Sequence, residues 1–216
     1  MVPITRRAAL RGATALLAGA AGCSDFEAGE STATAGRERD LENVATDPPH
    51  RTLRATTDAS IVWVDDGESG TNGTPRRYLS DRFIVDEASA DRLRFAESVD
   101  SAPVREFIAA TEFETETVYV DLSSVGECYR LELCYVGWSD AEIETRYGRT
   151  LRDADVSCGA DVRASVATFV RIPAAIDPER ISSYGSGMSS GGCRLPPWIR
   201  EPTAGDGSSA TTGEEE

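Results

Sequence analysis

The chain has 216 residues, of which 37 are acidic and 22 are basic, and every basic residue is an arginine. That length allows one ordinary domain with additional segments. The formal net charge of −15 argues against nucleic-acid binding, because such a surface repels phosphate groups. An acidic chain without lysine is typical of proteins that work in molar salt, where the Debye length falls to about 3 Å and neighbouring carboxylates no longer repel one another.

Residues 1–22 are predicted to be an export signal rather than part of the fold. Arg6 and Arg7 precede an apolar stretch that is shorter than the roughly 20 residues of a membrane-spanning helix. Small residues then lead to Cys23. The segments "TRRAAL" and "AAGC" resemble a twin-arginine export signal that ends in a lipobox. The resemblance implies that Cys23 is lipidated, becomes the first residue of the mature protein and anchors it to the membrane.

Three segments are polar and rich in small residues, without a sustained apolar period. Residues 23–58 are predicted to be a flexible tether, residues 200–216 a disordered acidic tail, and the Gly/Ser-rich residues 182–193 a loop. A further Gly-rich segment, residues 65–75, is predicted to be a mobile loop. It contains an N-glycosylation pattern at Asn72, which is a candidate for modification.

The remaining head, residues 59–199, contains short segments in which apolar and polar residues alternate. These segments predict strands over residues 59–65, 82–87, 93–97, 117–123, 142–148 and 165–173. One helix is predicted over residues 101–111, with Ser101 as its N-cap and Pro103 in its first turn. The head is therefore predicted to be mainly β, a small antiparallel β-sandwich with one short helix, and an α+β layer is the alternative.

Cys128 and Cys134 lie on one segment, "CYRLELCYVGW" (128–138). As a strand it would direct Tyr129, Leu131, Leu133 and Tyr135 toward the core and both cysteines away from it. Six strand residues span about 20 Å, whereas disulfide-bonded Cα atoms lie about 4.4–6.8 Å apart, so these cysteines need other partners. Four cysteines besides Cys23 predict two disulfides in an exported chain. The alternatives are Cys128–Cys158 with Cys134–Cys193, or Cys128–Cys193 with Cys134–Cys158.

The sequence also argues against several kinds of catalysis. The single histidine, His50, falls in the predicted tether, which disfavours Ser-His-Asp and Cys-His catalysis and two-histidine copper sites. Without a CxxC motif, zinc and redox roles are disfavoured, and no metal, cofactor or enzyme activity is expected. Two carboxylates suffice for glycoside hydrolysis, and "WSDAE" (138–142) offers Asp140 and Glu142. A hairpin turn with Trp138 at the core's edge is the favoured interpretation of that segment.

The signal, the acidic lysine-free composition and the four-cysteine β-rich head together resemble small lipoproteins of haloarchaea. The resemblance implies a position on the extracellular face of the cell membrane and implies no activity. The favoured hypothesis is a lipid-anchored binding or display module with an unidentified surface ligand or protein partner. The alternatives are an accessory subunit of a membrane-bound transport or redox complex and a carboxylate-based carbohydrate hydrolase.

Overall fold

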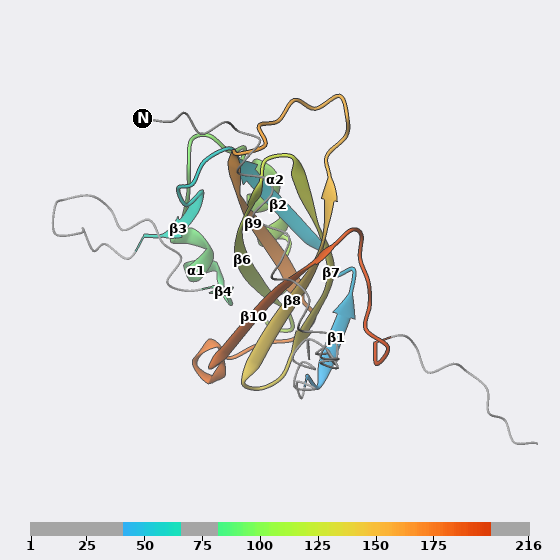
Figure 1. Cartoon of the computed structure of the whole chain (residues 1–216). Helices are drawn as coiled ribbons and strands as arrows, with labels where there is room; N and C mark the ends of the chain where they lie inside the picture. The colour runs from blue at the N-terminus through green and yellow to red at the C-terminus, as the bar shows by residue number, and fades with distance from the viewer. Residues whose placement is uncertain (1–40, 66–81, 200–216) are drawn as a thin grey trace, which may run out of the picture. The chain divides into compact units, whose positions relative to one another are not determined.

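A computed structural model describes residues 41–65 and 82–199 (Figure 1). The predicted export signal, the lipidation site, the glycosylation site at Asn72 and the predicted tail lie outside the described residues. Among the described helices, none is long and apolar enough to cross a membrane.

The described residues form two four-stranded sheets and one two-stranded sheet. The first sheet has the order β1 (Asn43–Thr46), β7 (Tyr129–Trp138), β8 (Glu142–Leu151) and β10 (Ser183–Ser190). The second has the order β2 (His50–Ala55), β9 (Arg163–Ile172), β6 (Thr117–Gly126) and β4 (Phe83–Ile84). The third pairs β3 (Val62–Val64) with β5 (Leu93–Phe95). The helices are α1 (Glu87–Asp91), α2 (Ala102–Ala109) and a 3₁₀ turn (Pro178–Arg180). The predicted mainly β, antiparallel fold is confirmed, with one exception: β10 runs parallel to β8.

The two four-stranded sheets pack face to face around an apolar core. The core side chains are Phe83, Tyr119, Val170 and Ile172 from the second sheet and Leu133, Val136, Trp138, Ile143 and Tyr147 from the first. The other face of the second sheet is covered by α2 and the β3–β5 pair (Figure 1). The side chains at that contact include Val118, Val120, Ala167, Phe169, Val104, Phe107 and Ile108. The second sheet is therefore a middle layer, buried on both faces, and its central strands are apolar on both sides.

The two helices begin at well-defined caps. The side chain of Asp86 accepts a hydrogen bond from the Ser89 amide at 2.7 Å, and the Ser89 hydroxyl accepts one from the Asp86 amide at 3.2 Å, which is a capping box for α1. The predicted helix is confirmed as α2, but the side chain of Ser101 makes no cap bond. Asp100 Oδ1 instead accepts a hydrogen bond from the Ala102 amide at 3.1 Å. Helix α1, with five residues, was not predicted, because one turn gives too short a periodic signal.

The predicted tether is wrong over its last part. Strand β1 pairs with β7, and strand β2 pairs with β9, so the folded head begins near residue 43 rather than at residue 59. Both strands lie at sheet edges, where hydrogen bonds to a neighbour order the backbone although Leu53 is their only buried side chain. His50 belongs to β2, is partly buried, and its Nδ1 lies 2.8 Å from the Pro48 carbonyl oxygen. The interpretation of His50 as a linker residue is therefore also wrong.

The Gly/Ser-rich segment predicted to be a loop contains strand β10. Its register with β8 runs without a shift from Ser183 opposite Glu142 to Ser190 opposite Arg149. The sequence "SYGSGMSS" is poor in β-branched residues, so propensity alone does not specify a strand there. The hydrogen bonds of the β8 backbone order the segment instead.

The cysteines form the first of the two predicted sets of disulfides, Cys128–Cys158 and Cys134–Cys193. The strand predicted over residues 128–138 is confirmed as β7, but a β-bulge interrupts it at Cys134. The bulge adds one residue to the strand, so Tyr135 turns away from the core face that it was predicted to share with Leu133. The predicted hairpin turn after β7 is confirmed, since the Ser139 amide donates to the Glu142 carbonyl oxygen at 2.9 Å.

Candidate functional site

The four edge strands of the two large sheets differ in how they could pair with another chain. Strands β1 and β4 have four and two residues. Strand β2 has six residues, carries Arg51 and Arg54, and follows Pro48 and Pro49. Short length, charge and proline are the usual protections of a sheet edge. Strand β10 has eight residues and none of these protections. No described strand pairs with the side of β10 that faces away from β8, and we call this side the β10 edge.

Both ends of β10 are fixed to the rest of the first sheet. At its start, the amides of Ser182 and Ser183 donate to the Ala141 carbonyl oxygen at 2.9 and 3.1 Å. At its end, the Gly191 amide donates to the Arg149 carbonyl oxygen at 3.0 Å. Two residues later, Cys193 is bonded to Cys134 of β7. These contacts hold a strand that has little apolar surface of its own to bury.

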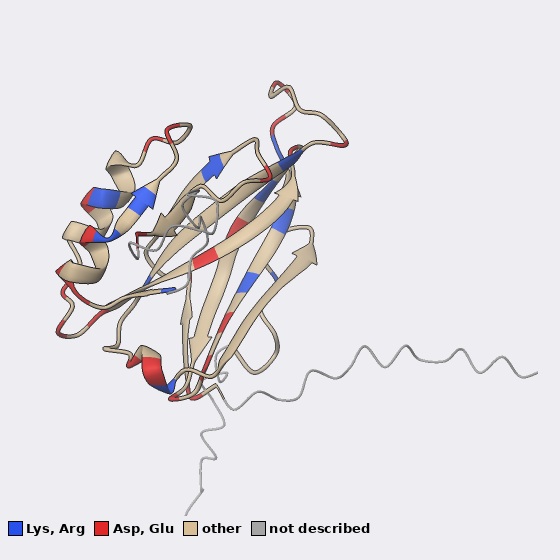
Figure 2. Cartoon of the chain, turned by 90° about the vertical axis from the view of Figure 1, so that its left-hand side faces the viewer, with Lys and Arg blue, Asp and Glu red and all other residues tan. Residues whose placement is uncertain are grey.

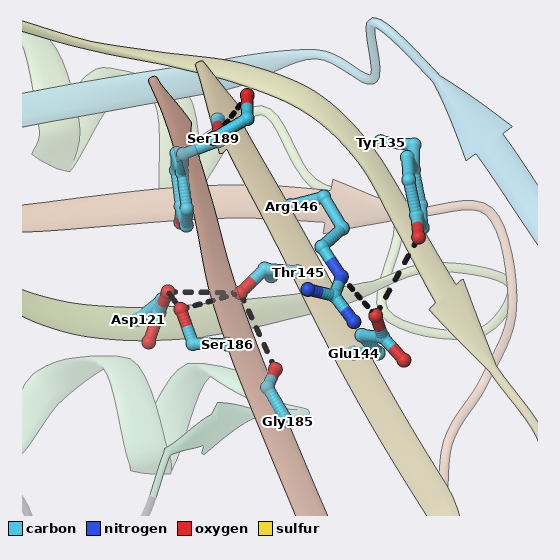
Figure 3. Close-up of polar contacts among 9 residues, drawn as sticks. Asp121, Tyr135, Glu144, Thr145, Arg146, Gly185, Ser186 and Ser189 are labelled. Carbon is cyan, nitrogen blue, oxygen red and sulfur yellow. Dashed lines mark hydrogen bonds and ion pairs between the residues drawn. The ribbon is translucent and has the colours of Figure 1, made fainter. Parts of the chain in front are cut away.

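A buried carboxylate holds the middle of β10. Asp121, on β6 in the opposite sheet, is only 1% exposed. Its Oδ2 accepts hydrogen bonds from the hydroxyl of Thr145 on β8 at 2.9 Å and from the hydroxyl of Ser186 on β10 at 3.0 Å (Figure 3). Asp121 therefore ties two strands of the first sheet to the second, in a position where apolar packing cannot do so.

Arg82, which directly precedes β4, lies beside this carboxylate and reaches β10. Its Nη1 is 3.7 Å from Asp121 Oδ1 and 3.4 Å from the Tyr119 hydroxyl oxygen, to which it donates. Its guanidinium also lies 5.6 Å from the ring centroid of Tyr184 on β10, within the range of a cation–π contact. Burial lowers the pKa of Arg82, but the hydrogen bond to Tyr119 and the charge of Asp121 outweigh burial, so the pKa is raised.

Tyr119 and Tyr147 complete the Asp121 cluster, which also contains Arg82, Thr145 and Ser186, and both phenols are held neutral. Burial, followed by the charge of Asp121, raises the pKa of Tyr119 to about 12. The same two causes raise the pKa of Tyr147 well above its ordinary value. Asp121 Oδ1 and Tyr147 Oη are buried and have no hydrogen-bond partner among the described residues. Asp121 Oδ1 has only the ion pair with Arg82 at 3.7 Å, and a buried polar atom without a hydrogen bond costs about 1–3 kcal/mol, so burial of this cluster is costly. Costly polar clusters of this kind are commoner at functional sites than in ordinary cores.

The exposed side chains of β10 are uncharged, which is unusual in so acidic a protein. Tyr184 and Met188 are 47% and 46% exposed, and Ser186 lies between them on the same face of the strand. Tyrosine and methionine are enriched in protein interfaces. Arginines lie on several other strands, and many acidic residues lie on helices and loops (Figure 2). Strand β10 has no charged residue at all.

The opposite face of β10 borders a second polar group. Glu144 of β8 is buried, is paired with Arg146, and accepts a hydrogen bond from the Tyr135 hydroxyl at 3.5 Å (Figure 3). Burial, followed by the charge of Glu144, raises the pKa of Tyr135. The side chain of Arg146 crosses close to Gly187, where a Cβ atom would collide with the guanidinium. Glycine at position 187 is therefore required for Arg146 to lie across β10.

Two hollows in the described residues are alternative candidate sites. The larger, of about 330 Å³, lies between α1, β5 and α2. Apolar side chains such as Leu93, Phe95 and Phe113 line it, with Arg105 among the few charged groups. That volume is at the lower end of ligand pockets. The hollow contains neither of the unpartnered buried oxygens of the described residues.

The second hollow, of about 240 Å³, lies beside the turn over residues 138–142, which contains the two carboxylates of the hydrolase hypothesis. Asp140 and Asp177 both line it, whereas Glu142 does not. Asp140 is paired with Arg180, and Asp177 Oδ1 accepts a hydrogen bond from the Glu179 amide at 3.0 Å as the cap of the 3₁₀ turn. Both carboxylates therefore already have structural partners.

The residues proposed from sequence are not brought together in one place. His50 lies on β2, at the edge of the second sheet opposite β4. The described part of the chain contains no group of three or more His, Cys, Asp or Glu side chains that could hold a metal ion. Asp121, Thr145, Ser186 and Arg82 were not singled out by sequence. Comparison of the chain with protein-family models, curated proteins and solved structures finds no match.

Proposed function

We propose that this protein is a lipid-anchored binding module on the outer face of the cell membrane, in an organism that lives in high salt, and that the β10 edge is its binding element. The observation that carries the proposal is an eight-residue, uncharged edge strand that is fixed at both ends and tied at its centre to Asp121. An unprotected strand of this kind can accept an extended segment of another chain as an additional strand.

The anchoring half of the proposal is supported by the N-terminal sequence and by the disulfides. The pattern around Arg6, Arg7 and Cys23 is that of an exported lipoprotein. Two disulfides are typical of proteins outside the cytoplasm. The 20 residues from Cys23 to Glu42 could span at most about 70 Å, which is enough to hold the head clear of a membrane.

In this proposal the backbone of β10 supplies affinity, and its side chains supply selectivity. A partner strand would hydrogen-bond to the outward amides and carbonyls of β10. Its side chains would lie against Tyr184 and Met188, whose exposed surfaces are the apolar part of the site. The Asp121 cluster would keep β10 in position before the partner arrives, which lowers the ordering cost of binding.

Hydrolysis is less well supported. Ser186 lies 3.0 Å from the carboxylate of Asp121, but a carboxylate is a far weaker base than the imidazole that usually activates a serine. The hydroxyl also bridges two sheets, which is a structural role. An accessory role in a membrane complex would use the same edge. The identity of the protein that crosslinks to this edge would distinguish an accessory role from a surface-display role.

The test uses Met188, the only methionine besides Met1. Photo-reactive methionine, incorporated in the native cells, would place one crosslinker on the β10 edge of the mature chain. Irradiation of those cells should give a defined protein adduct. The matched control carries Met188→Leu and Leu151→Met, which moves the crosslinker to another exposed apolar position. Equal adducts from both positions, or none from Met188, would contradict the proposed binding element. The intact mass of the same protein tests lipidation at Cys23.

A further inference from the structure

The exposed side chains of β10 are arranged so that the strand is complementary to itself. Resting on the proposed function of the β10 edge, we propose that its partner is β10 of a second copy of this chain. The two strands would run antiparallel about a two-fold axis at Ser186. Pairing of two four-stranded sheets at this edge would give one continuous eight-stranded sheet across the dimer. Such an interface is closed, because each copy uses the same edge for the other.

The spacing of the side chains fixes the register. When Ser186 faces Ser186 of the second copy, Tyr184 lies directly opposite Met188, and Gly185 lies opposite Gly187. Both exposed apolar side chains of one copy are then covered by those of the other, in two symmetric Tyr–Met pairs. A shift of the axis to Gly185 or Gly187 would place Tyr184 opposite a serine. The Tyr–Met register is also favoured by the attraction between a thioether sulfur and an aromatic ring.

The absence of charge on β10 makes a second copy a better partner than a charged peptide. Neither strand contributes a charged side chain, since "SYGSGMSS" contains none, and Arg146, which lies across Gly187, is paired with Glu144 of its own copy. Each copy also places Arg82 over its own Tyr184, so the rings that meet the partner are already held in position. Lipid anchors on one membrane would raise the local concentration of the heads, which favours contact between copies.

Because the chain is acidic, this dimer should become more stable as the salt concentration rises. Each whole chain carries a formal charge of −15, so two copies repel one another at long range. The Debye length is about 10 Å at 0.1 M salt and about 3 Å at 1 M salt, so added salt removes this repulsion. Interfaces built on ion pairs weaken in salt, whereas the β10 pairing should strengthen.

The experiment measures the mass of the full mature chain in solution by sedimentation at 0.1 M and 1 M salt, with Cys23→Ser to remove the lipid, and with circular dichroism to verify folding. We expect a dimer whose dissociation constant falls as salt rises. Met188→Asp should weaken the dimer by about tenfold or more, because it places a charge opposite the Tyr184 ring in both symmetric pairs. The matched control, Leu151→Asp, adds the same charge at an exposed position of β8 beyond the residues that pair with β10, and should leave the dimer unchanged.

A second measurement does not depend on a variant. An equal mixture of unlabelled chains and chains labelled with heavy nitrogen, both carrying photo-methionine, should give mixed-isotope crosslinks that join Met188 to the peptide containing Tyr184. A monomer at 1 M salt, a dimer unaffected by Met188→Asp, or crosslinks to another surface would overturn the proposal. A monomer in solution, together with a Met188 adduct to a different protein in cells, would overturn the dimer and leave the proposed function standing.

Discussion

Strands β9 and β10 are the last two strands of the described residues, and different interactions stabilise them. Strand β9 is central in its sheet, and it buries Val170 and Ile172 on one face and Phe169 on the other. Full burial of each such side chain contributes about 1.5–3 kcal/mol. Strand β10 lies at an edge and is composed mainly of serine and glycine. It depends on hydrogen bonds, each contributing about 0.5–1.5 kcal/mol, and on a nearby disulfide.

Because of this difference, β9 contributes mainly to the stability of the fold, whereas β10 is available for binding. A central strand has neighbours along both edges and cannot pair with another chain, whereas an edge strand can, and an edge strand with little buried surface needs other interactions to keep it ordered. In this protein the Asp121 cluster and the Cys134–Cys193 disulfide have that role. Strand β10 should consequently be among the least stable ordered elements of the head, as binding elements commonly are.

The largest effect is expected at the centre of the middle layer. Phe169→Ala should lower the free energy of unfolding by about 3–5 kcal/mol, because it removes a fully buried ring and leaves a cavity. Urea unfolding at constant salt measures the change. The matched substitution on β10 is Tyr184→Ala, which truncates a half-exposed ring and should cost much less. Similar losses for the two variants would contradict the contrast.

Loss of each disulfide should increase amide exchange in a different part of the head. Chain-entropy estimates give about 4 kcal/mol for the Cys134–Cys193 bond, which closes 59 residues, and about 3.5 kcal/mol for the Cys128–Cys158 bond, which closes 30. Replacement of either pair by serine should therefore lower the free energy of unfolding by similar amounts. Only loss of the Cys134–Cys193 bond should increase amide exchange in β10 selectively. Selective exchange in both variants would show that this bond has no special role in holding the strand.

High pH should destabilise the cluster through Tyr119. Its pKa is raised from 10.0 to about 12 in the folded protein, so the folded state favours the neutral phenol. The stabilisation is complete below pH 10 and is lost as the pH rises from 10 to about 12. The loss attributable to Tyr119 should approach about 3 kcal/mol. Unfolding measured across this range should be less dependent on pH in Tyr119→Phe, and an unchanged slope would mean that Tyr119 does not carry the effect.

Asp121→Ala should cost about 1–3 kcal/mol, because the hydroxyls of Thr145 and Ser186 lose their shared acceptor. Asp121→Asn keeps an acceptor oxygen and should cost less. Amide exchange in β10 should rise in the alanine variant more than in the asparagine variant. An alanine variant as stable as the wild type would indicate that the buried charge offsets the hydrogen bonds that it accepts.

The smallest effect is expected from Met188→Ala. Because nearly half of this side chain is exposed and β10 lies at an edge, the free energy of unfolding should change by no more than about 0.5 kcal/mol. The same substitution should weaken crosslinking or dimer formation, which thermal unfolding and sedimentation can measure separately. A large loss of stability would place Met188 in the fold rather than in the binding surface.

The sequence predicts the strands whose alternating side chains face a core. It does not predict the strands that are ordered mainly by hydrogen bonds to an adjacent strand. The alternation over 117–123, 142–148 and 165–173 locates β6, β8 and β9, because side chains of period two face a core. Strands β1, β2 and β10 have no such pattern, since hydrogen bonds to adjacent strands order them. The bulge at Cys134 is likewise a property of the pairing of β7 with β8.

The candidate site could not be predicted for a related reason. Asp121 is one of 37 acidic residues, and within "TVYVDLS" it occupies the face that would be solvent-exposed in a sheet with one covered face. It is buried because the second sheet is covered on both faces, which depends on the whole topology. The tie to Ser186 joins residues 65 positions apart in the sequence. No local signal connects them.

Hydrogen exchange of the β10 amides, measured in the full mature chain at high salt, shows whether β10 is an ordered strand. If β10 is an ordered strand, the amides that it donates to β8 should be protected, and the protection should decrease when Cys134 and Cys193 are replaced together. Exchange of Ser183–Ser190 in the wild type at the rate of an unstructured Gly/Ser segment would contradict this account and, with it, the proposed binding edge.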